Sequence, residues 1–272
     1  MLACPNASKW ACGQVVNAAR GLAHNAAARS LCSNVGGESR LACWQASAAA
    51  SGGSGVRTIA VISQKGGVGK STIAVHLAVA GTLAGLRTAL VDLDPQATAR
   101  KWGDDRQAAE PEVISDHAER LPQLADAARA NGADLLIIDS APNADRASLI
   151  AAKAADLILI PCRPAKFDLA AIEATRDLAT IAKKPAWVVL SAAPVRSAIV
   201  VEARQELEAK GSKIAPQIIH QRVAYYYSVI DGRTASEYEP GGKAAEEVAE
   251  LFRWACEQVG LPAGQKGEGT GQ

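Results

Sequence analysis

One short segment, Lys65-Gly66-Gly67-Val68-Gly69-Lys70-Ser71, constrains the fold more than any other part of this chain. It lies between the β-branched run 58–62 and residues 71–83, whose apolar spacing predicts a helix. Glycines permit the positive φ angles that turn backbone N–H groups inward, and the N-terminus of a helix adds its dipole. The order of strand, glycine-rich loop and helix predicts a site for nucleotide phosphates, formed by Gly66, Gly67, Val68, Gly69, Lys70, Ser71 and Thr72.

The side chains of this loop have separate expected roles. Lys70 is expected to reach the β- and γ-phosphates, the Ser71 hydroxyl to bind Mg²⁺, and Thr72 to reach the α-phosphate side. A second lysine, Lys65, opens the loop and either helps to neutralise phosphate charge or is an ordinary solvated lysine. Gln64 stands where the common Gly-x-x-x-x-Gly-Lys pattern has a glycine, so the loop departs from that pattern.

Strand-like and helix-like segments alternate through the rest of the chain. We expect strands at 58–62, 88–91, 135–138, 157–160, 187–190 and 214–219. We expect helices at 71–83, 121–130, 147–154, 169–182, 201–210 and 243–259. Such alternation predicts an α/β fold. We expect a doubly wound, mostly parallel sheet with helices on both faces, as in P-loop nucleoside triphosphatases.

The chain divides into three parts by composition. Residues 1–55 hold four of the six cysteines and four basic residues against one acid, a net charge of +3, and end in a Gly/Ser-rich stretch. We expect a disordered extension or a misassigned start there, with a functional N-terminal module as the alternative. Residues 56–261 are expected to form the nucleotide-binding domain, and residues 262–272 a flexible tail.

Composition excludes several classes of protein. No apolar run reaches the roughly 18 residues of a membrane-spanning helix. Lys and Arg total 29 against 28 Asp and Glu, which argues against a histone-like basic coat protein. Aromatic residues make up 4% of the chain, so a base-stacking platform is not expected. The two distant cysteines of the main domain favour a reducing cytoplasm.

Two further segments bring carboxylates to the ends of expected strands. Asp92 and Asp94 follow the second strand, and Asp139 ends another apolar run. Because ligands of open α/β sheets bind at the carboxyl ends of the strands, these acids are expected near the phosphate loop. Asp92 and Asp139 are candidates for the Mg²⁺ shell, and Asp94 for orienting the attacking water. Alternatively, one of the first two acids caps the next helix.

These motifs together resemble the ParA/MinD family of ATPases over about residues 56–261. Residues 63–72 read Ser-Gln-Lys-Gly-Gly-Val-Gly-Lys-Ser-Thr, which is similar to the family's deviant Walker A motif. Residues 92–96 and 237–245 resemble its first switch segment and the motif before its last helix. The segment 140–142 reads Ser-Ala-Pro where the family usually has Thr-Pro-Pro.

The resemblance implies a mechanism that composition alone does not. It implies ATP and Mg²⁺ as ligands and an ATP-dependent sandwich dimer, in which Lys65 reaches the partner's nucleotide like an arginine finger. It assigns hydrolysis to Asp94, with Lys65 and Lys70 as the other catalytic residues. It also implies binding to nonspecific DNA and a ParB-like centromere-binding partner that stimulates hydrolysis.

The C-terminal half of the chain indicates whether the protein binds DNA or a membrane. MinD-type members end in a basic amphipathic helix, but residues 259–267 contain proline and glycines and have no apolar face, so membrane binding is not expected. DNA contacts need only a local basic patch, and the alternative is an ordinary face of mixed charge. The candidate DNA-binding residues are Arg196, Arg204, Lys210, Lys213, Arg222 and Arg233.

The sequence therefore predicts a cytoplasmic, nucleoid-associated ATPase most like the small ParA-type partition proteins, which segregates plasmid or chromosome DNA. One alternative is a related ATPase that positions a protein cargo or assists conjugative DNA transfer. A further alternative is an ATP-gated DNA-binding scaffold that hydrolyses ATP slowly.

Overall fold

A computed structural model describes residues 55–142, 145–170 and 172–262. The expectations for residues 1–54 and 263–272 lie outside this range. The strands are β1 (Arg57–Val61), β2 (Thr88–Asp92), β3 (Glu112–Ser115), β4 (Leu135–Asp139), β5 (Leu157–Cys162) and β6 (Ala186–Leu190). The longer helices are α4 (Lys70–Leu83), α5 (Thr98–Asp105), α6 (Leu121–Ala130), α7 (Asp145–Ala154), α9 (Ile172–Ala182), α10 (Ala198–Ala209) and α13 (Lys243–Val259). Shorter helical turns are η1 (Ala118–Arg120), α8 (Lys166–Ala170), α11 (Val223–Ser228), η2 (Val229–Asp231) and α12 (Ala235–Tyr238).

The six strands form one sheet in the order β3-β2-β4-β1-β5-β6. Every pairing between them is parallel. The strands β2, β4 and β5 are buried along their whole length, as expected for a parallel sheet covered on both faces. Because all strands run the same way, the segments that follow β1, β2 and β4 meet at one edge.

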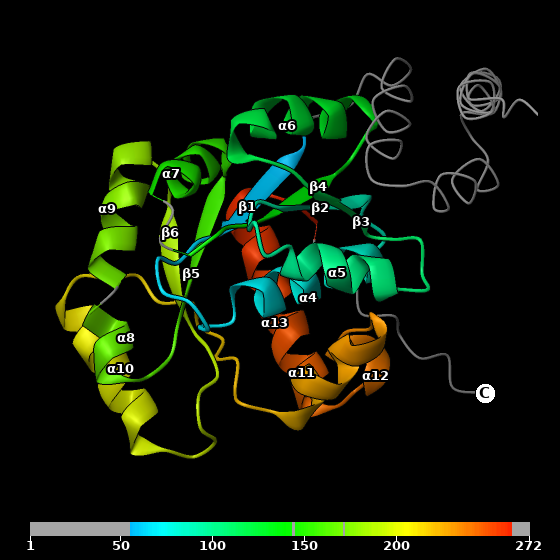
Figure 1. The fold of residues 1–272 in the computed structure, drawn as a ribbon. Coiled ribbons are helices and arrows are strands. Elements are labelled where there is room, and N and C mark those ends of the chain that lie inside the picture. The colour runs from blue at the N-terminus through cyan, green and yellow to red at the C-terminus, as the bar shows by residue number, and fades with distance from the viewer. Residues whose placement is uncertain (1–54, 143–144, 171, 263–272) are drawn as a thin grey trace, which may run out of the picture.

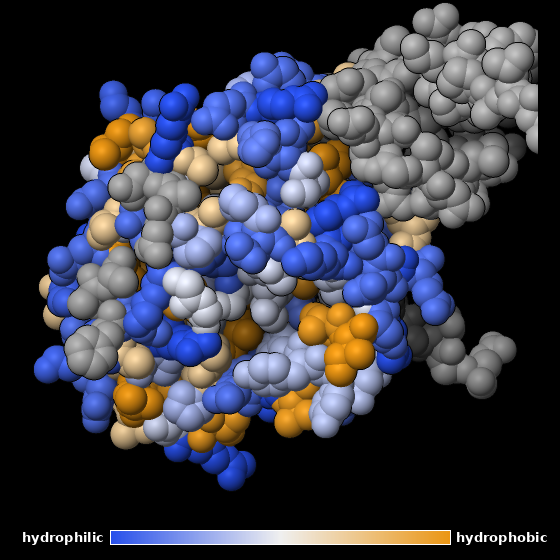
Figure 2. All heavy atoms as spheres, in the orientation of Figure 1, coloured by the Kyte–Doolittle hydropathy of each residue, from blue (hydrophilic) through white to orange (hydrophobic). Residues whose placement is uncertain are grey.

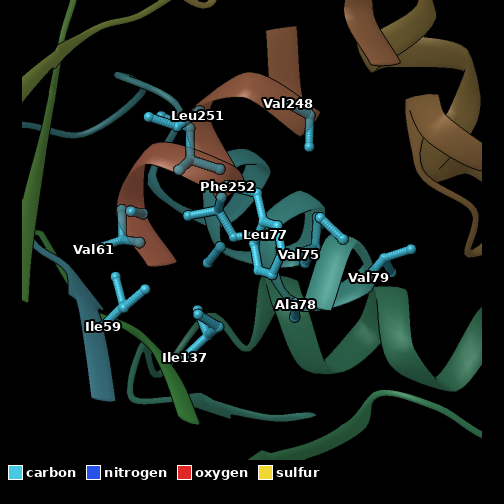
Figure 3. Packing of buried hydrophobic residues seen from close by; sticks show 14 of the residues in the cluster. Ile59, Val61, Val75, Leu77, Ala78, Val79, Ile137, Val248, Leu251 and Phe252 are labelled. Carbon is cyan, nitrogen blue, oxygen red and sulfur yellow. The ribbon is translucent and has the colours of Figure 1, made fainter. Parts of the chain in front are cut away.

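Helices cover both faces of this sheet (Figure 1). On one face Ile59 and Val61 of β1 pack with residues of α4, α5, α11 and α13. On the other, Ala60 of the same strand packs with α6, α7, α9 and α10. Figure 3 shows Ile59 and Val61 pointing toward the residues of α4 and α13, among them Leu77 and Phe252. The alternation of side chains along β1 thus fills two cores, and the predicted fold class is confirmed.

One strand was missed and one expected strand is incomplete. The edge strand β3 has only four residues and two buried side chains, so its apolar signal is too short to recognise. Residues 214–219 lie beside β6 but bridge to it only at Val188 and Ile214; a second isolated bridge, Ala193 with His220, lies just beyond both segments. Pro216 has no N–H group, so it cannot donate to a continuous ladder.

Three short helices, α5, α11 and α12, were not predicted, and the single helix expected at 169–182 corresponds to the end of α8 and the whole of α9. Only Ala99 and Trp102 of α5 are buried, so its eight residues hold too few apolar side chains for the helix to be recognised from the sequence. Within the described part of the chain, none of the helices is long and apolar enough to cross a membrane.

Candidate nucleotide-binding site

The phosphate loop connects β1 to α4 and takes the shape that its glycines allow. Gly67 and Gly69 have φ angles of 72° and 92°, in the left-handed region that favours glycine. The buried Ser191 hydroxyl, which follows β6, donates to the Val68 carbonyl oxygen at 2.7 Å. The guanidinium of Arg163, after β5, donates to the Gly67 carbonyl oxygen. Two neighbouring segments therefore hold the loop against the sheet.

The two lysines of the loop point in different directions. Lys70 is 6% exposed, and its Nζ donates to the Lys65 carbonyl oxygen at 3.0 Å, which places the ammonium inside the loop. Burial lowers the pKa of Lys70, and the charges of Asp139 and Asp94 oppose this shift. The side chain of Lys65 is 37% exposed and forms an ion pair with Asp168 of α8. Lys65 thus lies at the mouth of the loop, where solvent or a second molecule can reach it.

Asp139 is a fully buried acid of the site. It ends β4 beside Asp92 of β2, with which it is in register, and neither residue is exposed. Burial raises the pKa of Asp139 to about 7; nearby Ser71 lowers it in part, and the charge of Asp92 raises it further. Within the described ranges, neither carboxylate oxygen of Asp139 has a hydrogen-bond partner of good geometry. A buried carboxylate with unused oxygens, next to a serine hydroxyl, fits the preference of Mg²⁺ for oxygen ligands.

The other two acids organise the segment after β2. Asp92 accepts hydrogen bonds from the backbone N–H groups of Asp94 (2.9 Å) and Arg100 (3.0 Å). Burial raises the pKa of Asp92, and these amide hydrogen bonds oppose that shift. Arg100 lies in the first turn of α5, so Asp92 satisfies a free N–H of that helix, as the capping alternative proposed. Asp94 accepts from the N–H of Gln96 at 2.9 Å and is half-buried at the edge of the site.

A clamp that sequence reasoning missed fixes α5 to the C-terminal part of the chain. Arg106, just after α5, makes a bidentate ion pair with Glu237 of α12 at 2.9 and 2.6 Å. It also donates to the Gly232 carbonyl oxygen at 2.8 Å, and the Trp102 indole donates to the Arg233 carbonyl oxygen at 2.9 Å. These partners are more than 120 residues apart, and no local pattern identifies them.

The structure does not bring the six candidate DNA-binding residues together. Arg196 lies in the loop that follows the carboxyl end of β6. The backbone N–H of Gln221 donates to the Ala193 carbonyl oxygen of this loop at 2.8 Å, which places the neighbouring Arg222 beside it. Lys210 ends α10 at the amino end of β6, where the Lys213 carbonyl oxygen accepts from Val188. A five-residue strand separates these two groups by about 15 Å. Arg204 lies on α10, and Arg233 precedes α12 on the other side of the sheet.

Three of these six cations are paired with acids. Glu247 of α13 accepts from Arg222 at 2.6 Å and from the His220 ring at 2.7 Å. Burial would raise the pKa of Glu247, but its hydrogen bonds from Arg222 and His220 lower it. The others pair Arg233 with Asp231, and Lys210 with Glu173 and Glu206. His220 is thus a hydrogen-bonded side chain.

Comparison with known proteins agrees with this geometry. The model of the CobQ/CobB/MinD/ParA nucleotide binding domain matches residues 59–234. The chain is 33% identical to the maintenance of carboxysome distribution protein A of Gloeobacter kilaueensis, over 75% of this chain and 94% of that protein. It is 26% identical to the chromosome-partitioning ATPase Soj of Thermus thermophilus, over 72% of this chain and 94% of Soj.

The fold is similar to that of solved structures. One is the septum site-determining protein MinD of Pyrococcus horikoshii in complex with Mg-ADP. The TM-score is 0.61 at 18% identity, and the match covers 75% of this chain and 98% of that one. At this level of identity the likeness shows the fold alone.

Proposed function

Because this chain belongs to the CobQ/CobB/MinD/ParA family of nucleotide-binding domains and is a ParA/MinD-family ATPase, we propose that it works as an ATP-driven positioning switch. In this proposal ATP and Mg²⁺ assemble a sandwich dimer, the dimer binds nonspecific DNA, and hydrolysis to ADP and phosphate releases it. The observation that carries the proposal is the convergence of Lys70, Ser71, Asp92 and Asp139 at one edge of the sheet.

Different residues of the site would hold the phosphates and the metal ion. The loop N–H groups and Lys70 would bind the phosphates, and Ser71, Asp139 and Asp92 would hold Mg²⁺ directly or through water. Mg²⁺, when bound, neutralises the charge that develops on the phosphates. Asp94, at the edge of the site, would orient the attacking water.

Lys65 is proposed to act on the nucleotide of the second subunit. Its exposure and its pairing with Asp168 support this role, because its ammonium is directed away from the interior of its own loop. To reach a partner's phosphate, Lys65 must exchange the Asp168 carboxylate for a group of higher negative charge. Dimer formation would therefore depend on ATP.

Among the six candidates, Arg196 and Arg222 are the best placed for DNA contacts, although Glu247 already pairs with Arg222. They lie near one another after β6, at the edge of the sheet that carries the phosphate loop. Arg196 is exposed and makes no ion pair with any residue in the described ranges. Two copies of this small patch in a dimer would give DNA binding that weakens with salt.

The cargo is proposed to be either DNA, through a ParB-like partner, or a protein assembly. The family resemblance favours the first, and the names of two relatives favour the second. Both are called maintenance of carboxysome distribution protein A, and they are 33% and 30% identical to this chain, against 26% for Soj. In the organism that carries the gene, deletion would distinguish them, because DNA loss indicates a DNA cargo and a misplaced protein assembly indicates the other.

The nucleotide switch is tested by DNA binding with ATP, with ADP and without nucleotide, together with phosphate release. We expect binding with ATP alone, loss of nucleotide binding in Lys70→Ala, and ATP binding without turnover in Asp94→Ala. Lys65→Ala should bind ATP but fail to dimerise. The control replaces Lys153, an exposed residue of α7, and Lys153→Ala should bind ATP and dimerise like the wild type. DNA binding that is equal in all nucleotide states would refute the switch. ATP-dependent binding with negligible turnover would favour the slow scaffold.

A further inference from the structure

A row of apolar side chains lies uncovered on the outer side of α11 and η2. These two elements form one helical segment, because Ser228 and Val229 at their junction keep right-handed helical backbone angles. The members of this outer row are each between 55% and 70% exposed, and they are Val223, Tyr226, Tyr227 and Ile230. Their spacing of i, i+3, i+4 and i+7 places them on one side of the helix. Figure 2 shows hydrophobic and weakly polar residues at the surface over α11 and α12.

The opposite side of the same helix is packed into the core. Ala224, Tyr225 and Ser228 are buried there. The Tyr225 hydroxyl donates to the Ala244 carbonyl oxygen at 3.1 Å, and the Tyr225 ring packs edge-on against His76 of α4 at 5.0 Å. The core is therefore complete without the outer row, and the helix presents that row to solvent in a fixed orientation.

The size of the outer row argues against a second copy of this chain as its occupant. Two tyrosines, a valine and an isoleucine at these exposures offer roughly 500 Å² of surface. A stable interface buries about 800 Å² on each partner. The row is about 10 Å long, since a helix rises 1.5 Å per residue, and it is one helix side wide. Such a strip fits the apolar side of a single helix.

The end of the row near Ile230 is acidic. Asp231 comes next in the chain, and Gly232 lies against the backbone of Asp105, the last residue of α5. Asp231 is paired with Arg233. Asp105 is exposed and makes no ion pair with any residue in the described ranges. A segment that carries lysine or arginine beside its apolar side would complement this charge.

The helix that carries the row also contacts the path to the nucleotide site. The Trp102 indole of α5 donates to the carbonyl oxygen of Arg233, just after η2, at 2.9 Å. At the other end of α5, the N–H of Arg100 donates to Asp92 of the site at 3.0 Å. A single short helix thus connects the segment behind the outer row to an acid that is expected to support Mg²⁺.

We propose that the outer row docks a helical segment of a partner protein, apolar on one side and basic beside it, and that docking changes ATP turnover through α5. The docking follows from the exposed row and its acidic end. The effect on turnover rests on the proposed function.

Fluorescence anisotropy with the full chain and a labelled model peptide tests the docking. The peptide has about 18 residues, long enough to form a helix, with leucines on one side and lysines elsewhere. Saturating ADP and Mg²⁺ keep the nucleotide state constant. Tyr227→Ser and Ile230→Ser should each raise the dissociation constant at least about tenfold, because each removes most of an apolar side chain that the peptide would cover. Asp105→Lys should raise it about threefold or more.

Ile181→Ser is the matched control. Ile181 of α9 is 61% exposed and lies on the helix layer of the other sheet face. Its replacement should leave the dissociation constant within about twofold of the wild-type value. A second peptide of equal composition, with the leucines spread evenly around the helix, should bind at least about tenfold more weakly. Because the replaced side chains are exposed, the circular dichroism spectra and melting temperatures of all variants should match the wild type.

Three results would overturn the docking. These are equal binding of the two peptides, an equal loss of binding in Ile181→Ser, and self-association of the wild type that Ile230→Ser abolishes. The last result would assign the row to a second copy of the chain.

Phosphate release from ATP tests the effect on turnover. The model peptide should change the rate at least about twofold in the wild type and leave it unchanged in Ile230→Ser. An unchanged rate in wild type that binds the peptide would refute the link through α5. Absence of ATP hydrolysis would instead contradict the proposed function, and the binding measured with ADP would still decide the docking.

Discussion

His76 allows a sharp test of how α4 is held in the core. Its ring accepts a hydrogen bond from the backbone N–H of Ala235 at Nε2 (3.1 Å), so Nδ1 carries the proton and donates to the Thr72 carbonyl oxygen (2.7 Å). The Tyr225 ring packs edge-on at 5.0 Å. Burial lowers the pKa of His76 to about 4, while the Thr72 hydrogen bond and the charge of Glu237 only partly oppose the shift. The folded protein therefore holds His76 neutral.

The magnitude follows from the two pKa values. In the unfolded chain His76 binds a proton near pH 6.5, and in the folded chain only near pH 4. Between these values the unfolded state binds more protons, so the free energy of unfolding falls as the pH falls. The loss attributable to His76 is about 2 kcal/mol at pH 5 and approaches about 3 kcal/mol at pH 4. Above pH 6.5 this stabilisation is fully present.

Urea denaturation followed by circular dichroism, at pH 8, 6 and 5, measures this loss in the wild type and in His76→Gln. Gln retains an acceptor for the Ala235 N–H but does not titrate, so the variant should lose about 2 kcal/mol less than the wild type between pH 8 and pH 5. The exposed His117 provides the control, and His117→Gln should follow the wild type. Equal pH dependence in wild type and His76→Gln, or a native His76 titration near pH 6.5 by NMR, would refute the reasoning.

Three further predictions concern single contacts of the described chain. Ser191→Ala leaves the buried Val68 carbonyl oxygen without its donor and should cost about 1–2 kcal/mol of stability and weaken ATP binding; unchanged ATP affinity by fluorescence titration would contradict the anchoring role. A Cβ at Gly232 would lie 2.3 Å from backbone of the residue after α5, so Gly232→Ala should cost about 3 kcal/mol or more by urea denaturation. Gly241→Ala, also left-handed but in open space, should cost only about 1 kcal/mol, and equal losses would show that crowding is irrelevant. Glu247→Ala removes the shared acceptor of three side chains and should lower the melting temperature by several degrees; no change would mean that those donors find water instead.

Much of the fold was predictable because its signals are local. The apolar runs of β1, β2, β4, β5 and β6 are each long enough to stand out, and the helices between them carry the period of a buried face. The strand β3 and the helix α5 were not predicted, for the opposite reason. Each is short and contributes only two buried side chains, so tertiary contacts rather than local preference stabilise them.

The DNA-binding candidates show a different limit of sequence reasoning. Arg196 and Lys213 are 17 positions apart, yet α10 runs back along the sheet between them and places them at opposite ends of β6. The sequence also does not show whether a basic side chain forms an ion pair with an acidic one. Arg222 and Arg233 each lie against an acid, and only the structure identifies it.

From local patterns alone, the sequence predicts the phosphate loop, the parallel sheet and the acids at its carboxyl edge. It could do so because backbone geometry imposes them locally: glycines turn the loop, and parallel strands deliver their ends to one edge. Three other contacts follow from packing: Asp92 caps α5, Lys65 faces Asp168, and Arg106 joins the end of α5 to α12. Those contacts join distant or unpatterned positions, and they form only when the packing of both faces of the sheet brings the segments together.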